Sequence, residues 1–179
     1  MMPTGPLMIE HRLIEKMVAR IVQEGKRIEG GGHVDHDFLL DAVDFMRNYA
    51  DRCHHGKEED ILFLDLRKKH MSMELEASLD QLIKDHIRAR DLVRSIEEGS
   101  SKMVLGDASA KEQIVNAIAE MGALYPRHIE EEDKRFFIRA MELFSREEKD
   151  AMIAEFHEFD RMLIHERYRR VYERWTSKM

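Results

Sequence analysis

Residues 39–61 read LLDAVDFMRNYADRCHHGKEEDI, and the spacing of the apolar side chains in this stretch decides the fold. They recur every three or four residues, which predicts one core-facing side of an amphipathic helix. His54 and Glu58 continue the same side, where further apolar residues would be expected. Burying such groups without partners is costly, and a bound cation removes that cost by binding both. The stretch therefore predicts a core helix that carries metal ligands.

Three other segments repeat this pattern. Each has an apolar side with steps of three and four residues, interrupted by a histidine and, in the last segment, by a glutamate as well. The four predicted core-facing sets are Leu7, His11, Ile14, Val18 and Ile21; Leu39, Val43, Met46, Ala50, His54, Glu58 and Ile61; Leu75, Leu79, Leu82, His86, Ala89, Val93 and Ile96; and Ile114, Ile118, Met121, Tyr125, His128, Glu132 and Phe136.

The histidines also agree in height along the predicted helices. His11 and His54 each lie about 20 residues from the glycine turn at residues 30–32, so both should lie roughly 30 Å from it. His54 and His86 match nearly as well around the next turn. His128 matches less evenly, at about 19 residues against 13, and depends on the long loop and a bend at Pro126. The heights therefore predict that the four histidines meet.

Turn and capping signals divide the chain into five helices. We expect them at about residues 6–28, 35–69, 73–98, 109–143 and 145–175, the last opened by a capping box at Ser145 and Glu148. Short links favour antiparallel neighbours, so residues 1–144 should form an all-α, up-down-up-down four-helix bundle. The C-terminal helix, residues 145–179, has its own apolar side and should pack on the bundle or on a second copy in a homodimer. That side contains Met152, Phe156, Phe159 and Leu163.

Composition limits the classes of function. A formal net charge of −7 and a sequence pI near 5.8 argue against nucleic acid as a partner. No apolar run approaches the roughly 20 residues that cross a bilayer, and the start lacks the features of a secretory signal. The single cysteine excludes an internal disulfide and fits a reducing compartment. We therefore expect a cytoplasmic protein without a membrane partner.

The predicted site contains four histidines and two glutamates. Imidazole and carboxylate ligands together suit iron or manganese, and two carboxylates can bridge two cations. The i,i+4 spacing of His54 with Glu58 and of His128 with Glu132 places each pair on one helix face. The acidic side chains of Glu59, Asp60, Glu130, Glu131 and Asp133 are expected to be solvated.

These residues resemble those of the hemerythrin-like, or HHE cation-binding, domains. The matching segments are IEHRLIE around His11, CHHGKEEDILF around His54, KDHIRAR around His86 and RHIEEED around His128. The resemblance spans roughly residues 7–140. It implies two non-haem iron ions, bridged by the two glutamates and a solvent-derived oxygen. It also implies the ligand set His11, His54, Glu58, His86, His128 and Glu132.

The sequence departs from the family pattern in one place. Oxygen-carrying hemerythrins have two histidines one turn apart on the third helix, whereas His86 has Leu82 and Arg90 as its i−4 and i+4 neighbours. An iron with one histidine fewer keeps an open position, which favours reaction over reversible carriage. His55 could fill the gap, although its position beside His54 predicts a partly exposed side chain off the core-facing side.

Other candidates have a structural interpretation that we prefer. Tyr125 is expected to be a core residue, with a hydrogen bond to a ligand or a bound oxygen species as the alternative. Cys53 is expected to be buried and inert rather than redox-sensitive, and Lys57 and Arg90 to be solvated. The five remaining histidines are not expected to be ligands: His33, His36, His70, His157 and His165.

Two functions remain open. One is a redox protein that reacts with dioxygen, peroxide or nitric oxide, with a peroxidase-like, catalase-like or oxidase activity. The other is a non-enzymatic protein that binds, stores or senses oxygen or iron. A metal-free helical scaffold would not account for the polar residues in the core. A ferritin-like carboxylate site would need Glu-x-x-His pairs on two helices, and none is placed on a predicted core face.

Overall fold

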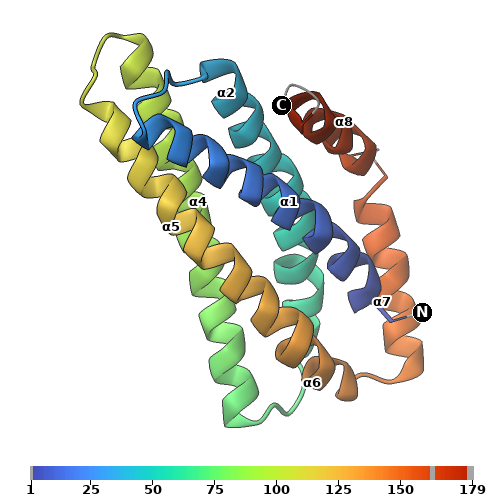
Figure 1. The fold of residues 1–179 in the computed structure, drawn as a ribbon. Coiled ribbons are helices and arrows are strands. Elements are labelled where there is room, and N and C mark those ends of the chain that lie inside the picture. Colours follow the sequence, from blue (N-terminus) through green and yellow to red (C-terminus); the bar gives the residue numbers. More distant parts are fainter. Residues whose placement is uncertain (1, 162–163, 177–179) are drawn as a thin grey trace.

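The computed structural model describes residues 2–161 and 164–176, and they form a helical bundle (Figure 1). The predicted all-α class is confirmed, since no strand occurs among these residues. The elements are α1 (Thr4–Glu29), α2 (His36–Phe45), η1 (Met46–His55), η2 (Glu58–Phe63), α3 (Leu64–Leu66), α4 (Met73–Val104), α5 (Ala110–Glu131), η3 (Glu132–Phe136), α6 (Phe137–Glu142), α7 (Arg146–Phe159) and α8 (Ile164–Thr176).

Three of these elements, η1, η2 and η3, are π-helical. The chain is helical without a break from α2 to α3 and again from α5 to α6, where the periodicity predicted two ordinary α-helices. A π turn closes an i→i+5 hydrogen bond instead of i→i+4, so it changes which residues face the core, and such turns are frequent at functional sites. All three π segments carry candidate ligands.

The third predicted helix is longer than expected. Gly99, Ser100 and Ser101 suggested a loop, but α4 continues through them to Val104. At Gly99 an added Cβ would lie 2.7 Å from Ile114 Cγ1. This glycine therefore allows α4 and α5 to approach closely inside a helix and does not end one.

The expected fifth helix, residues 145–175, is divided. The capping box at Ser145 and Glu148 opens α7 as predicted, but the chain turns at Asp160 and Arg161 before α8 begins. Met152 and Phe156 are buried as expected, whereas Phe159 is 40% exposed, and Leu163 lies outside the described residues. The two helices lie along one side of the bundle (Figure 1). Whether they also contact a second copy stays a prediction.

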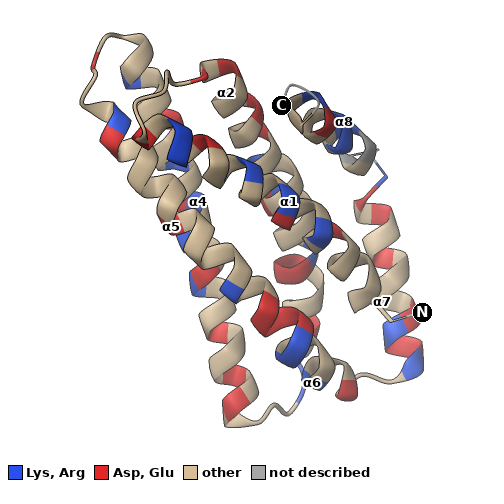
Figure 2. Cartoon of the chain, viewed as in Figure 1, with Lys and Arg blue, Asp and Glu red and all other residues tan. Residues whose placement is uncertain are grey.

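Ring contacts attach α8 to the bundle. The Tyr168 ring packs edge-on against Phe45, at 5.6 Å between centroids, and Trp175 packs against Phe38 at 5.1 Å. Acidic and basic residues are interspersed along the helices (Figure 2). None of the helices in the described part of the chain is both long enough and apolar enough to cross a membrane.

The core consists of two apolar clusters. On α1 the chain passes from one cluster to the other between Leu7 and Ile14, and on α4 between Leu82 and Ala89. The second and fourth long segments make the same passage between Ala50 and Ile61 and between Ile129 and Phe136. The candidate ligands lie at or beside these four passages, so the polar site separates two halves of an apolar interior.

Candidate metal centre

Seven buried histidine and glutamate side chains gather at this level of the bundle. Each is at most 3% exposed. They form two groups, and within each group the ligand atoms all lie within 4.8 Å of one another. The first group is His11, His54, Glu58 and Glu132, and the second is His55, His86 and His128. The structure thus brings together all six residues of the predicted set and adds His55.

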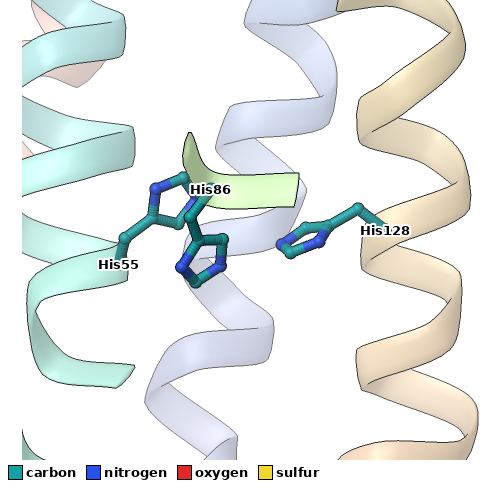
Figure 3. Close-up of side chains that lie close together, drawn as sticks. All are labelled: His55, His86 and His128. Atoms are coloured by element: carbon teal, nitrogen blue, oxygen red, sulfur yellow. The ribbon is translucent and has the colours of Figure 1, made fainter. Parts of the chain in front are cut away.

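The position of His55 differs from the sequence-based expectation. Its side chain is only 2% exposed, and its ring stacks on His86 with 3.8 Å between centroids. His54 and His55 are the last two residues of the π segment η1, and both face the interior. Figure 3 shows His55, His86 and His128 converging from three different helices. α4 contributes one histidine, His86, to this group, and η1 supplies His55 as its third imidazole.

The two glutamates connect the groups. Glu58 Oε1 lies 3.5 Å from His54 Nε2, and Glu58 Oε2 lies 3.5 Å from His86 Nε2. Glu132 Oε2 lies 3.2 Å from the Nε2 atoms of both His11 and His128. Each carboxylate thus faces a histidine of either group, an arrangement that could bridge two cations.

A carboxylate lies beside the Nδ1 atom of every one of the five histidines. Four of these contacts are within hydrogen-bond range, and the fifth, His128 with Asp85, is longer. They are His11 with Asp133 at 2.7 Å, His54 with Glu10 at 2.8 Å, His55 with Asp51 at 3.3 Å, His86 with Glu59 at 2.7 Å, and His128 with Asp85 at 3.6 Å. A proton held on Nδ1 leaves Nε2 unprotonated, with a lone pair that can bind a metal. Metal-binding histidines are usually oriented in this way.

Two expectations about the acidic runs were wrong. Glu59 and Asp133 were expected to be solvated, but they orient His86 and His11. Sequence reasoning did not find Glu10, Asp51 or Asp85 at all. Glu10 and Asp85 reach their histidines because the helices pack together, and Asp51 lies one helical turn before His55. The spacing of apolar residues in the sequence does not identify such acidic residues.

Burial favours the neutral forms of the ligands, so it shifts the pKa values of the histidines and of Glu58 in opposite directions. Burial lowers the pKa of His54, His55 and His86 well below the usual value, so these imidazoles are neutral. Burial, together with the nearby Glu132, raises the pKa of Glu58 well above its ordinary value. Burial lowers the pKa of His11 too, but its contacts with Asp133 and Glu132 outweigh burial and raise that pKa to about 9. Neutral imidazoles are the form that binds a metal, so His11 and Glu58 would each have to release a proton.

The clearest sign of a missing partner is a set of orphaned polar atoms. Among the described residues, nine buried side-chain atoms of this site have no hydrogen-bond partner: Nε2 of His11, His54 and His86, Nδ1 and Nε2 of His128, and both carboxylate oxygens of Glu58 and Glu132. Buried polar atoms are nearly always paired in folded proteins. Two cations would satisfy the Nε2 and carboxylate atoms, so the residues fit a metal pair.

The remaining candidates divide into confirmed and corrected expectations. Tyr125 and Cys53 are buried as expected, and burial raises the pKa of both side chains. Lys57 was expected to be solvated but is fully buried. Arg90 is half-buried and donates to Asp51 and Glu59.

The other five histidines lie outside the seven-residue site. Within the described part of the chain, His33, His36, His70 and His157 belong to no group with metal-binding geometry. His165 does lie in such a group, with Glu10, Cys53 and Asp160. However, the Lys57 ammonium already contacts both carboxylates there, so this group holds an internal cation.

Comparison with known families gives one match. The model described as the hemerythrin HHE cation binding domain matches residues 2–140. Comparisons with curated proteins and with solved structures gave no match. The matched range covers α1 to α5, η3 and part of α6, and it ends before α7 and α8.

Proposed function

The chain belongs to the hemerythrin HHE cation-binding domain family, and from this premise we propose that it holds two non-haem iron ions and reacts with dioxygen, peroxide or nitric oxide. The observation that carries the proposal is the set of buried Nε2 and carboxylate atoms without partners. They converge in two adjacent groups, one of imidazoles and carboxylates and one of three imidazoles. Such a combination of imidazole and carboxylate ligands suits iron.

In this proposal each ion has its own histidines. His11 and His54 would hold one ion, and His55, His86 and His128 the other, with Glu58 and Glu132 shared between them. When bound, an iron pair supplies two electrons to an O–O bond or one to nitric oxide. The single cysteine fits the reducing cytosol that we propose as its location.

The protein's own groups prepare the site. Carboxylates at Nδ1 fix the direction of the imidazoles, and such partners commonly contribute 10–100-fold to metal affinity. The apolar clusters on either side, with Phe137 stacked 5.9 Å from His11 and Phe63 stacked 5.9 Å from His86, exclude bulk water. A dry surrounding strengthens the attraction between the carboxylates and the cations.

We also propose a route for the small ligand. A pocket of about 240 Å³ opens between η1 and α4, and its lining includes His55, Tyr125, Ala89 and Val93. His55 and Tyr125 also border the His86 and His128 side chains. A molecule the size of peroxide that enters this pocket would meet the three-histidine group first, with the Tyr125 side chain beside it.

The second candidate is non-enzymatic binding, storage or sensing of oxygen or iron. One observation favours it: the C-terminal α7–α8 unit contacts Glu10, the partner of His54, and so gives the site a connection to the outside of the bundle. Turnover separates the two candidates. An enzyme decomposes peroxide over many cycles, whereas a binding protein changes its spectrum once per ligand.

Metal analysis of protein purified without added metal tests the proposal. We expect near two irons per chain, together with an oxo-to-iron absorption band. Replacing Glu58 with Ala should remove metal, whereas replacing the exposed His70 should not. If His70→Ala loses as much iron as Glu58→Ala, or if the wild-type protein has no affinity for iron, the proposal is wrong.

A further inference from the structure

A second polar cluster, with a buried part and a half-buried part, lies on the far side of His54 from the metal site. It consists of Glu10, Lys57, Asp160 and His165, and we refer to it as the Glu10 cluster. The Lys57 side chain is 0% exposed, and its Nζ contacts Glu10 Oε1 and lies 2.7 Å from Asp160 Oδ2. His165 Nε2 lies 3.0 Å from Asp160 and 3.4 Å from Glu10. Every member therefore contacts at least two others.

The Glu10 carboxylate connects this cluster to the metal site. Its Oε2 lies 2.8 Å from His54 Nδ1, while its Oε1 faces Lys57 and His165. Glu10 is 1% exposed, so water does not compete for either oxygen. The contacts of Lys57 and His165 with Oε1 therefore also determine how the Glu10 carboxylate is oriented toward His54.

Two members of the cluster come from outside the matched domain. Asp160 follows α7 and His165 lies on α8, whereas the family match ends at residue 140. The bundle has a place for this turn: an added Cβ at Gly56 would lie 2.9 Å from the Phe159 ring. Cys53 adds a further contact, since its thiol donates to Asp160 Oδ1 at 3.1 Å. The turn after α7 is thus seated against the segment that carries His54 and His55.

The Lys57 ammonium is attracted to two carboxylates, those of Glu10 and Asp160. With Asp160 present, the ammonium is shared by two carboxylates, and the three groups together carry one net negative charge. Without the Asp160 charge, Lys57 would pair with Glu10 alone and draw its electron density away from His54. A histidine whose Nδ1 partner is less negative is a weaker metal ligand, because that partner raises the basicity of the imidazole.

We propose that Asp160 is a positioning residue through which the C-terminal α7–α8 unit sets the iron affinity and reduction potential of the ion held by His11 and His54. This inference rests on the proposed function. The contacts run from Asp160 to Lys57, from Lys57 to Glu10 and from Glu10 to His54. Loss of the Asp160 charge weakens iron binding and raises the reduction potential, since nearby negative charge stabilises the more positive oxidised ion and its removal favours the reduced one.

The test compares Asp160→Asn with Asp150→Asn in the full chain. Both changes remove one negative charge from the same C-terminal unit, but Asp150 is exposed on α7 and is not part of the Glu10 cluster. Iron affinity is measured by competition with a chelator, and the potential by spectroelectrochemistry. We expect Asp160→Asn to weaken iron binding about three- to tenfold, less than the 10–100-fold typical of a direct partner of a ligand. Its potential should rise, and Asp150→Asn should match the wild type.

A double-mutant cycle with Glu10→Gln separates positioning from general destabilisation. If Asp160 acts through Glu10, Asp160→Asn has no further effect on affinity or potential in the Glu10→Gln background. Asp160→Glu, which keeps the charge, should restore most of the affinity. If Asp160→Asn does not fold, His165→Asn at a 34% exposed side chain gives the milder test. It removes a ring N–H that faces both Asp160 and Glu10, so Glu10 becomes more negative, and the shift should be smaller and in the opposite direction.

The outcomes are distinguishable from those of the proposed function. If the wild type binds two irons and Asp160→Asn shifts neither quantity relative to Asp150→Asn, this inference alone is wrong. The same holds if the effects of Asp160→Asn and Glu10→Gln simply add. If the wild type binds no iron, both the proposed function and this inference fail.

Discussion

Replacing Glu58 with Leu should stabilise the metal-free protein. Glu58 is fully buried and neither of its oxygens has a hydrogen-bond partner within the described residues. An unsatisfied buried polar group costs about 1–3 kcal/mol, and an apolar side chain of similar shape removes that cost. At roughly 2–4 °C per kcal/mol for a chain of this size, the melting temperature should rise by about 2–12 °C.

Iron should reverse this order. At a free iron concentration 100 times the dissociation constant, each bound ion stabilises the folded state by about 2.7 kcal/mol. The wild type should therefore gain roughly 5–10 °C per ion, whereas Glu58→Leu loses a residue that, in the proposed function, both ions share. The variant should melt above the wild type without metal and below it with metal.

Thermal melts followed by far-UV circular dichroism, with chelator and with iron, measure both halves of this prediction. Glu130→Leu is the matched control, because Glu130 is 58% exposed and, among the described residues, forms an ion pair only with Lys134 at i+4. It should change stability by no more than about 0.5 kcal/mol and keep the full response to iron. The reasoning is refuted if metal-free Glu58→Leu melts below the wild type, or if iron stabilises the variant as much as the wild type.

Three further predictions concern the surroundings of the site. Glu59→Gln removes the carboxylate at His86 Nδ1 and should weaken iron binding about 10–100-fold in a chelator competition. Asp60→Asn changes the exposed neighbouring residue and should not weaken it. Equal effects of the two variants would show that Glu59 does not support the site. Val93→Phe should narrow the proposed pocket and slow the association of azide, measured by stopped flow, while the iron content stays unchanged. An unaltered rate would mean that small ligands reach the site by another route. Burial opposes ionisation of Asp160, but hydrogen bonds from the cluster, including that from Lys57, lower its pKa from 3.8 to about 2. This carboxylate should therefore contribute at most about 2 kcal/mol of unfolding free energy above pH 4, lost as pH falls toward 2. Acid titration of metal-free Asp160→Asn should lack that loss, and an unchanged pH profile would contradict it.

Most of the metal-binding face follows from helical periodicity. An α-helix returns to the same side every three or four residues, so the apolar steps around His11, His86 and His128 determine which way these side chains face. The same rule places Glu58 one turn beyond His54. The structure brings these side chains together because the rule holds on α1, α4 and α5. Their function as ligands stays a prediction.

The carboxylate partners of the histidines lie beyond the reach of such a rule. Glu10 precedes His11 in the sequence but contacts His54 on another helix, and Asp133 contacts His11 across the bundle. A single acidic residue on a helix looks the same whether it faces water or a neighbouring imidazole. Only the packing of the helices distinguishes the two, which is why Asp133 was expected to be solvated.

His55 was misplaced for a different reason, and that reason explains how the site is built. On an α-helix, consecutive side chains point about 100° apart, so a narrow core-facing stripe that contains His54 leaves His55 out. The buried face is wider than that stripe and includes both histidines at the end of η1, where α4 offers no second histidine. The other π segments begin at Glu58 and Glu132, the two residues that face both groups. The periodicity rule therefore places Glu58 and Glu132 on the core-facing side, where they are buried, and misses His55, because it does not show how wide the buried face is. A change that turned either histidine of η1 outward would leave its group with one imidazole fewer.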